Sequence, residues 1–291
     1  MTEQYFQCGR TRFPLTVGAS VSRRPLVMGI LNVTPDSFSD GGRFNSLESV
    51  LDCAEQMIAD GVDIIDIGGE SSRPGALSLS VEEELRRVLP VVYALRDYGK
   101  PLSVDTYKPA VMREVLAAGA DMINDIHGFT APGAIDAVRD ADCGLCVMHM
   151  LRDPLTMQSQ PTYQDVVGEV VDFLQQQVMR LEAAAVARNR LCVDPGFGFG
   201  KNLTHNVDLL KNLAHIQQQL RLPLLAGLSR KSMLQGLTGK TVEHRLAASL
   251  AAALVATANG AQILRVHDVA ETVDALKVWM ACTDPVLTES N

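Results

Sequence analysis

Short apolar runs recur along the whole chain, and a polar, glycine or charged residue ends each of them. Every run is too short for a helix and is bounded by Gly, Pro or Asp, which is typical of fully buried parallel strands. Helix-length segments lie between the runs, so strand and helix alternate. The eight predicted strands cover residues 26–33, 64–67, 102–104, 122–123, 144–148, 191–193, 224–226 and 262–266.

The ends of the intervening helices carry their own signals. Ser80-Val81-Glu82-Glu83 has the form of a capping box, and Ser46 is a candidate N-cap before the next helix. A repeated pattern of helix end, glycine and strand start surrounds Gly61, Gly119 and Gly260, where glycine supplies a left-handed turn residue.

These elements predict an α/β fold, namely a single (β/α)8 barrel over residues 25–283. Residues 1–24 are expected to form a β-hairpin that closes the bottom of the barrel, and residues 284–291 a C-terminal tail. A length of 291 residues suits one barrel with an appendage, and 47% hydrophobic with 21% charged residues is ordinary for a packed globular protein.

Charge and cysteine content narrow the class of protein. A formal net charge of -8 argues against nucleic-acid and anionic-membrane binding, so an anionic substrate would have to be held by local positive groups. Neither a membrane span nor a signal-peptide core is evident, and a soluble, cytoplasmic protein is expected. Cys143 and Cys146 form a lone CxxC on a predicted strand, so buried free thiols are expected there.

Polar residues at the carboxyl ends of the predicted strands should converge on one pocket, because barrel chemistry is located at that face. They are Asn32, Glu70, Asp105, Asn124, His149, Asp194, Arg230, Arg265 and His267.

The last two strands lead into residues 227–232 and 265–268, which combine a helix start, hydroxyls and several cations. Phosphate groups bind at such places in barrels, so a phosphorylated substrate is predicted. Taken singly, Lys231 could be a solvated lysine and His267 a capping residue. Asp105, Asp194 and Asn124 predict a ligand rich in hydrogen-bond donors, such as an amino heterocycle, although strand-end aspartates also cap helices.

Several motifs together resemble the bacterial dihydropteroate synthases, in order and in register with all eight strands. They are LNVTPDSFSDGG (31–42), GGESSRPGA (68–76), SVDT (103–106), MHM (148–150), DPGFGFGK (194–201), SRKS (229–232) and RVHD (265–268). The resemblance implies a folate-synthesis transferase that joins 6-hydroxymethyl-7,8-dihydropterin diphosphate to p-aminobenzoate and releases pyrophosphate. It also implies a homodimer formed through the later helices and competitive inhibition by sulfonamides.

The resemblance also implies residue roles. Asp194 and Asn124 would hold the pterin, Lys231 would contact its ring, and Asp105 would lie near developing positive charge. Arg265, His267 and Asn32 would hold the diphosphate, Asn32 together with Mg²⁺. Further pterin-diphosphate contacts are assigned to Ser72 and Val266. The implied catalytic residues are Asp105, Lys231, Arg265 and His267. The implied p-aminobenzoate pocket consists of Phe38, Ser72, Arg73, Pro74, Phe199 and Ser232.

The chain departs from the family pattern at two places. Ser72 stands where threonine is usual, and Leu151-Arg152 replace a small or polar residue followed by glycine. Three other classes share some of these features: a methyltetrahydrofolate-dependent methyltransferase, a Schiff-base aldolase using Lys231, and a non-catalytic pterin-binding paralogue. The first has no diphosphate to hold, the second needs a lysine alone in an apolar niche, and the third should lack loop residues that are present here.

Overall fold

The computed structural model describes residues 4–15, 24–33, 43–71, 75–153, 156–158 and 161–283. Its centre is a sheet of eight parallel strands in the order β8-β7-β6-β5-β4-β3-β10-β9. A parallel bridge between Val193 and Leu224 joins the two edges, which makes the sheet a barrel and confirms the predicted fold. The strands are β3 (Leu26–Asn32), β4 (Ile64–Gly68), β5 (Leu102–Asp105), β6 (Met122–Asp125), β7 (Gly144–Met148), β8 (Leu191–Asp194), β9 (Leu225–Ala226) and β10 (Ile263–Val266).

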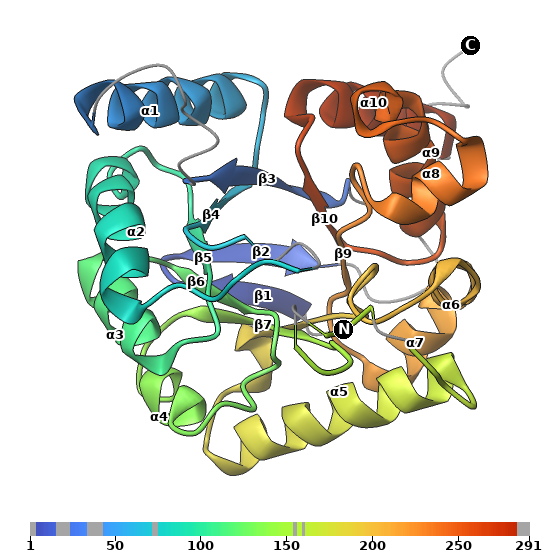
Figure 1. The fold of residues 1–291 in the computed structure, drawn as a ribbon, viewed down its shortest axis with the longest axis horizontal. Coiled ribbons are helices and arrows are strands. Elements are labelled where there is room, and N and C mark those ends of the chain that lie inside the picture. The colour runs from blue at the N-terminus through green and yellow to red at the C-terminus, as the bar shows by residue number, and fades with distance from the viewer. Residues whose placement is uncertain are drawn as a thin grey trace.

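Helices surround the strands and cover the outside of the barrel (Figure 1). Each presents an apolar face to the strands, and together they bury one continuous core. The α-helices are α1 (Arg43–Ala59), α2 (Val81–Leu95), α3 (Pro109–Ala118), α4 (Ala134–Val138), α5 (Val166–Ala183), α6 (Leu203–Lys211), α7 (Leu213–Leu220), α8 (Ser232–Thr238), α9 (Leu246–Ala258) and α10 (Val269–Thr283). Two short 3-10 helices are η2 (Arg188–Arg190) and η3 (Val242–His244).

Of the two predicted N-cap residues, the structure confirms Ser80 and contradicts Ser46. Ser80 is the N-cap of α2, and its side chain accepts the backbone N–H of Glu83 at 3.2 Å, as predicted. Ser46 is not an N-cap, because α1 already begins at Arg43. No proline or glycine stands between Arg43 and Ser46, so nothing in the sequence stops the helix from beginning earlier, after the two glycines at 41–42.

The predicted glycine turns are confirmed. Gly61, Gly119 and Gly260 have φ values of +92°, +113° and +91°, in the left-handed region that favours glycine. Each of them ends a helix and leads the chain into the next parallel strand.

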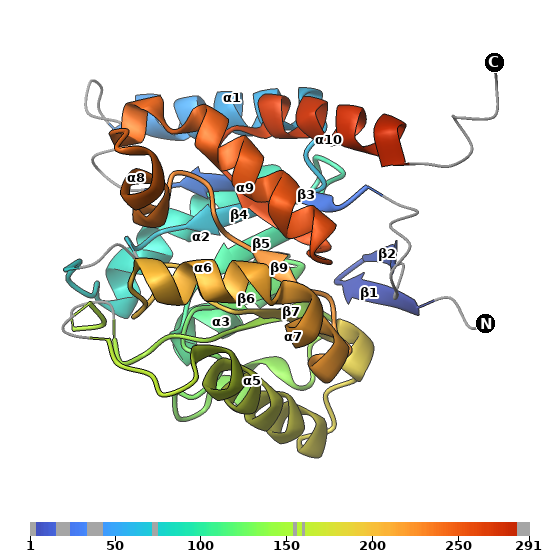
Figure 2. The same ribbon diagram turned by 90° about the vertical axis from the view of Figure 1, so that its right-hand side faces the viewer.

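The N-terminal hairpin closes the bottom of the barrel, as predicted. It consists of β1 (Gln4–Cys8) and β2 (Thr11–Leu15), and Figure 2 shows it at the end of the barrel opposite to α8. Its buried residues Phe6 and Cys8 form one apolar cluster with residues of the strands: Met28, Ile64, Met122, Cys146, Cys192, Leu225 and Ile263.

Asp121 fastens the hairpin to the barrel. One of its oxygens accepts the backbone N–H and the Nε–H of Arg10 at 3.2 and 3.1 Å, and the other accepts the N–H of Leu102 at 3.1 Å. The predicted buried thiols are also present, because Cys143 and Cys146 are free and buried. The predicted tail, 284–291, lies outside the described residues. In the part of the chain that the structure describes, no helix has the length and apolar character needed to cross a membrane.

Candidate active site

A buried ion-pair network occupies the carboxyl end of the barrel. Arg265, on β10, donates from Nε to Asp66 Oδ2 at 2.6 Å and from Nη2 to Asp105 Oδ2 at 2.9 Å. Asn124 donates from Nδ2 to the same oxygen of Asp66 at 3.3 Å. The planar guanidinium suits two carboxylates presented side by side. Three predicted site residues, Asp105, Asn124 and Arg265, are thereby brought together.

Asp66 was not predicted as a site residue. It is fully buried in β4, between Ile65 and Ile67. The signal was present in the sequence as a carboxylate inside an otherwise apolar strand, because a buried charge needs a partner. Its other oxygen, Oδ1, and the Oδ1 of Asn124 are both buried, and neither has a hydrogen-bond partner within the described residues.

The network shifts the ionisation of its members. Burial raises the pKa of Asp105 to about 7, while the Arg265 guanidinium opposes that rise. Burial alone would lower the pKa of Arg265, but Asp66 and Asp105 outweigh it and raise that pKa. Arg265 therefore remains a cation while Asp105 can exchange a proton near neutral pH.

Asp194 ends β8 and is almost completely buried. Its Oδ1 accepts the backbone N–H of Gly196 at 2.7 Å, and burial raises its pKa against the opposing effects of this bond and of Lys231. Gly196 has a φ of +71°, and a Cβ there would lie 1.9 Å from the carbonyl oxygen of His149. Only glycine allows the chain to turn this closely after the aspartate.

Lys231 lies above an apolar cluster beside the network. It is half-buried at the N-cap of α8, and its Nζ lies 4.1 Å from the ring centroid of Phe199. Burial and the nearby Arg265 lower the pKa of Lys231 to about 8. Phe199 is part of a buried cluster at this end of the barrel, whose other members are Ile126, Met148, Met150 and Met157.

His149 and Lys201 hold the turn behind Asp194. The Lys201 ammonium donates to His149 Nδ1 and to the carbonyls of Gly196 and Phe199 at 2.9, 2.9 and 3.1 Å. Burial lowers the pKa of Lys201 to about 7 and that of His149 to about 2. His149 thus contacts Lys201, which was not predicted as a site residue although it ends the DPGFGFGK motif.

Arg230 comes after β9 and His267 comes after β10, and their side chains make different contacts. The Oγ of Ser229 accepts the backbone N–H of His267 at 3.2 Å and lies 3.1 Å from its Nδ1. Burial, Arg230 and Arg265 lower the pKa of His267 to about 4, so the ring is neutral at pH 7. Arg230 does not converge on the network: its exposed side chain pairs with Asp268 instead.

The other predicted residues are placed as follows. Asn32 is exposed at the end of β3, next to Gly68, and Ser232 is exposed at the start of α8. The side chain of Val266 packs in the hydrophobic core, and its expected contact with the pterin diphosphate stays a prediction. Phe38, Ser72, Arg73 and Pro74 lie outside the described residues.

The structure shows how the fold accommodates Leu151 and Arg152, which depart from the family pattern. Arg152 has a φ of +66°, in the left-handed region, where the glycine expected from the family pattern would be unstrained. Leu151 packs closely against Gly200, where an added Cβ would lie 2.5 Å from the Leu151 Cβ. The loop thus keeps the left-handed backbone conformation that glycine favours, although arginine occupies position 152.

Fold and site define a pterin-binding barrel enzyme: residues 28–267 match the family described as "Pterin binding enzyme". The dihydropteroate synthase of Escherichia coli (strain K12) is 52% identical over 255 residues, which cover 87% of this chain and 90% of that protein. The dihydropteroate synthase of Neisseria meningitidis serogroup C is 46% identical over 285 residues, 97% of this chain and 98% of the other.

Solved structures of dihydropteroate synthases are similar to this chain in both fold and sequence. The dihydropteroate synthase of Burkholderia cenocepacia complexed with 7,8-dihydropteroate has a TM-score of 0.87 and 52% identity, with 99% of each chain covered. The Xanthomonas albilineans enzyme with 4-aminobenzoic acid has a TM-score of 0.89 and 48% identity, covering 97% of this chain and 99% of that one. The chain belongs to the dihydropteroate synthase family and is a transferase, as its motifs indicated.

Proposed function

We propose that the carboxyl end of the barrel binds a pterin diphosphate and transfers its pterin-methyl group to p-aminobenzoate, giving 7,8-dihydropteroate and pyrophosphate. The observation that carries this proposal is a set of buried acceptors. Asp66 Oδ1 and Asn124 Oδ1 have no hydrogen-bond partner within the described residues, and Asp194 is buried close by. A buried acceptor is costly unless a donor meets it. The amino group and ring N–H of a pterin are such donors.

The diphosphate would lie toward Arg265 and His267, and Lys231 would contact the pterin ring. Because the Oγ of Ser229 accepts the backbone N–H of His267, its hydroxyl hydrogen is free to donate to Nδ1 of the same ring. The proton of the neutral imidazole would then be on Nε2, where it can donate to a phosphate oxygen. Arg265 and Lys231 add positive charge below pH 8.

We further propose that Mg²⁺ takes part, with Asn32 as its protein ligand. No cluster of three or more His, Cys, Asp or Glu suited to a metal occurs in the described part of the chain. Mg²⁺ bound with a diphosphate keeps several waters and needs only one or two protein oxygens. The exposed amide of Asn32 at the end of β3 fits that requirement. When bound, the ion would offset charge on the departing pyrophosphate.

For p-aminobenzoate we propose a pocket made of Phe199 and Ser232 with Phe38, Ser72, Arg73 and Pro74. The Xanthomonas albilineans structure with 4-aminobenzoic acid supports this class of substrate. The amine of p-aminobenzoate is unprotonated at neutral pH and can attack without a strong general base. A sulfonamide, which has a similar shape, would compete for this pocket, and the Yersinia pestis enzyme is known in a complex with a sulfonamide drug.

The proposed reaction depends mainly on electrostatic stabilisation of the charges that develop on the leaving group and on the pterin. The methylene C–O bond breaks with its electron pair leaving on pyrophosphate, the amine nitrogen bonds to the methylene carbon, and one amine proton is released. Arg265 and His267 would stabilise the leaving group. Asp105, which is paired with Arg265 in the network, would stabilise positive charge that develops on the pterin.

We also propose a cytoplasmic homodimer that forms through α9 and α10. Leu246, Val255 and Val278 are 39%, 46% and 66% exposed on these helices, an arrangement that a second copy could cover. The six cysteines are free, which suits a reducing compartment. Light scattering at several concentrations, with Val255→Asp as the variant, tests the dimer; a wild-type monomer would refute it.

The test of the reaction is formation of dihydropteroate from the pterin diphosphate and labelled p-aminobenzoate, with Mg²⁺ and then with a chelator. Product that depends on Mg²⁺ is expected. Asp194→Ala should lose binding of a pterin analogue in calorimetry while keeping its fold by circular dichroism. Retained pterin binding without any product from the wild-type protein would instead indicate a non-catalytic pterin-binding paralogue.

A further inference from the structure

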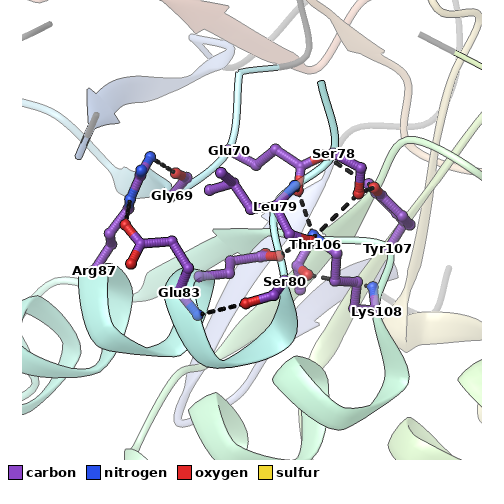
Figure 3. Close-up of polar contacts among 11 residues, drawn as sticks. Gly69, Glu70, Ser78, Leu79, Ser80, Glu83, Arg87, Thr106, Tyr107 and Lys108 are labelled. Carbon is purple, nitrogen blue, oxygen red and sulfur yellow. Dashed lines mark hydrogen bonds and ion pairs between the residues drawn. The ribbon is translucent and has the colours of Figure 1, made fainter. Parts of the chain in front are cut away.

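A second polar cluster lies beside the ion-pair network, around Glu70 (Figure 3). Glu70 follows β4, and its side chain is 11% exposed. Its Oε1 accepts the hydroxyl of Tyr107 at 2.9 Å, while its Oε2 accepts the backbone N–H of Leu79 at 3.0 Å and the ammonium of Lys108. The side chain of Glu70, near the start of the β4–α2 connection, is therefore bonded to a residue close to the end of that connection.

Tyr107 extends the same link to Ser78, the residue before Leu79. Because its hydroxyl donates to Glu70, it accepts from the Oγ of Ser78, 2.6 Å away. Its ring stacks on His127 with centroids 4.3 Å apart and planes 11° apart. Tyr107, in the β5–α3 loop, is thus packed against the β6–α4 loop.

The preceding residue, Gly69, is also held, by contacts with α2. Arg87 on α2 donates from Nη1 to the Gly69 carbonyl at 3.0 Å, and a Cβ at Gly69 would lie 2.6 Å from Val88 Cγ1. Helix α2 therefore packs directly on the backbone where the connection leaves the barrel.

Lys108 balances the charge of the cluster. Its Nζ also donates to Glu84 Oε2 at 2.5 Å, and the Glu84 side chain is only 1% exposed. Removal of the lysine would leave Glu84 buried without a cation, which is expected to unfold the region. Glu70 is the better target for a test because its neutral isostere keeps the volume.

We propose that Glu70 is a positioning residue that, through Leu79, Tyr107 and Ser78, fixes both ends of the connection 70–79 and thereby sets the affinity for p-aminobenzoate. This inference rests on the proposed function, which places Ser72, Arg73 and Pro74 of that connection beside p-aminobenzoate. Glu70 makes no bond to the Arg265 network among the described residues, so binding of the pterin diphosphate should be separate from it.

The first test measures steady-state kinetics of Glu70→Gln with each substrate varied in turn. The KM for p-aminobenzoate should rise about tenfold, because a charge-assisted bond to Leu79 N–H and the pair with Lys108 are lost. kcat and the KM for the pterin diphosphate should stay within twofold. Tyr107→Phe keeps the stacking on His127 and should raise the same KM about threefold.

The matched control is Glu182→Gln, which removes a glutamate of an exposed ion pair with Arg188 on the far side of the barrel. It should change neither KM. A proportional fall of kcat, or an equal rise of both KM values, in Glu70→Gln would overturn the proposal, since either would indicate a general structural role.

A second test needs no substrate. Amide hydrogen exchange should be faster in Glu70→Ala for peptides covering residues 75–80, and unchanged for peptides from the middle of α2. Unchanged exchange at 75–80 would refute the link between Glu70 and Leu79. Faster exchange with an unchanged KM for p-aminobenzoate would refute its functional consequence. A wild-type protein that makes no dihydropteroate would refute the proposed function instead, and the exchange result would stand apart from it.

Discussion

Gly196, in the turn after Asp194, can be compared with Gly239, which has the same φ value. Gly196 and Gly239 both have a φ of +71°, so alanine at either position is strained to a similar degree in its backbone. Around Gly239 no atom lies within 4 Å of an added Cβ. At Gly196 the Cβ would lie 1.9 Å from the carbonyl oxygen of His149, far inside van der Waals contact.

The expected magnitudes follow from this difference. A left-handed alanine costs about 1–2 kcal/mol, offset by about 0.4–1 kcal/mol because the unfolded chain loses freedom. Gly239→Ala should therefore lower the free energy of unfolding by about 0.5–1 kcal/mol. Gly196→Ala adds an overpacking cost of about 1–3 kcal/mol because the clash is with backbone and cannot be relieved by a rotamer change.

Thermal unfolding measures both variants against wild type. A protein of this size should lose about 2–4 °C in Tm for each kcal/mol, so we expect a loss of roughly 3–16 °C for Gly196→Ala and roughly 1–4 °C for Gly239→Ala. Calorimetry with a pterin analogue should show weaker binding only for Gly196→Ala, because Gly196 N–H holds Asp194 Oδ1. Equal Tm losses would refute the close approach of Gly196 to His149.

Four further predictions concern other parts of the chain. Asp66→Asn should lower kcat/KM about 10- to 100-fold, a loss of about 1.5–3 kcal/mol, because Arg265 loses a charged partner; wild-type kinetics would exclude Asp66 from the site. The Lys231 cation is present below its pKa of about 8, so affinity for a pterin diphosphate analogue should fall as pH rises through 8, and Lys231→Arg should abolish that fall in calorimetry. Ala185 has a φ of +67°, so Ala185→Gly should raise Tm by about 1–3 °C; a decrease would argue against a strained alanine. Asp121→Ala should lower Tm and expose Cys8 to a thiol reagent, whereas a thiol count equal to wild type would show that the hairpin stays docked.

Protonation of Lys231 also affects stability, and the sign can be worked out. Its pKa is lower in the folded protein than in the unfolded chain, where 10.5 is the ordinary value. Between pH 8 and about 10.5 the unfolded chain therefore binds more protons. The contribution of Lys231 to the free energy of unfolding rises with pH in that window, even as the site loses the cation that we propose contacts the pterin ring.

The barrel could be predicted from the sequence because its signals are local. Buried parallel strands appear as apolar runs, and a glycine such as Gly119 marks a helix end whatever the rest of the fold does. Strand ends also identify the face on which polar side chains gather, so Asp105, Asn124 and Arg265 were expected together. Ser46 was misplaced because its preference for the N-cap position is too weak to fix the helix start by itself, and no proline or glycine between Arg43 and Ser46 prevents an earlier helix start.

Only the tertiary structure decided which polar groups meet. Arg265 and Asp66 are 199 residues apart and come into contact only when the barrel closes, and the direction of Asp66 depends on strand register. Lys201 and Glu70 likewise owe their roles to partners on other elements, His149 and Tyr107. The sequence by itself determined the elements, because short-range backbone preferences set them. Closure of the barrel determined the network, because buried charges are stable only where distant partners neutralise them.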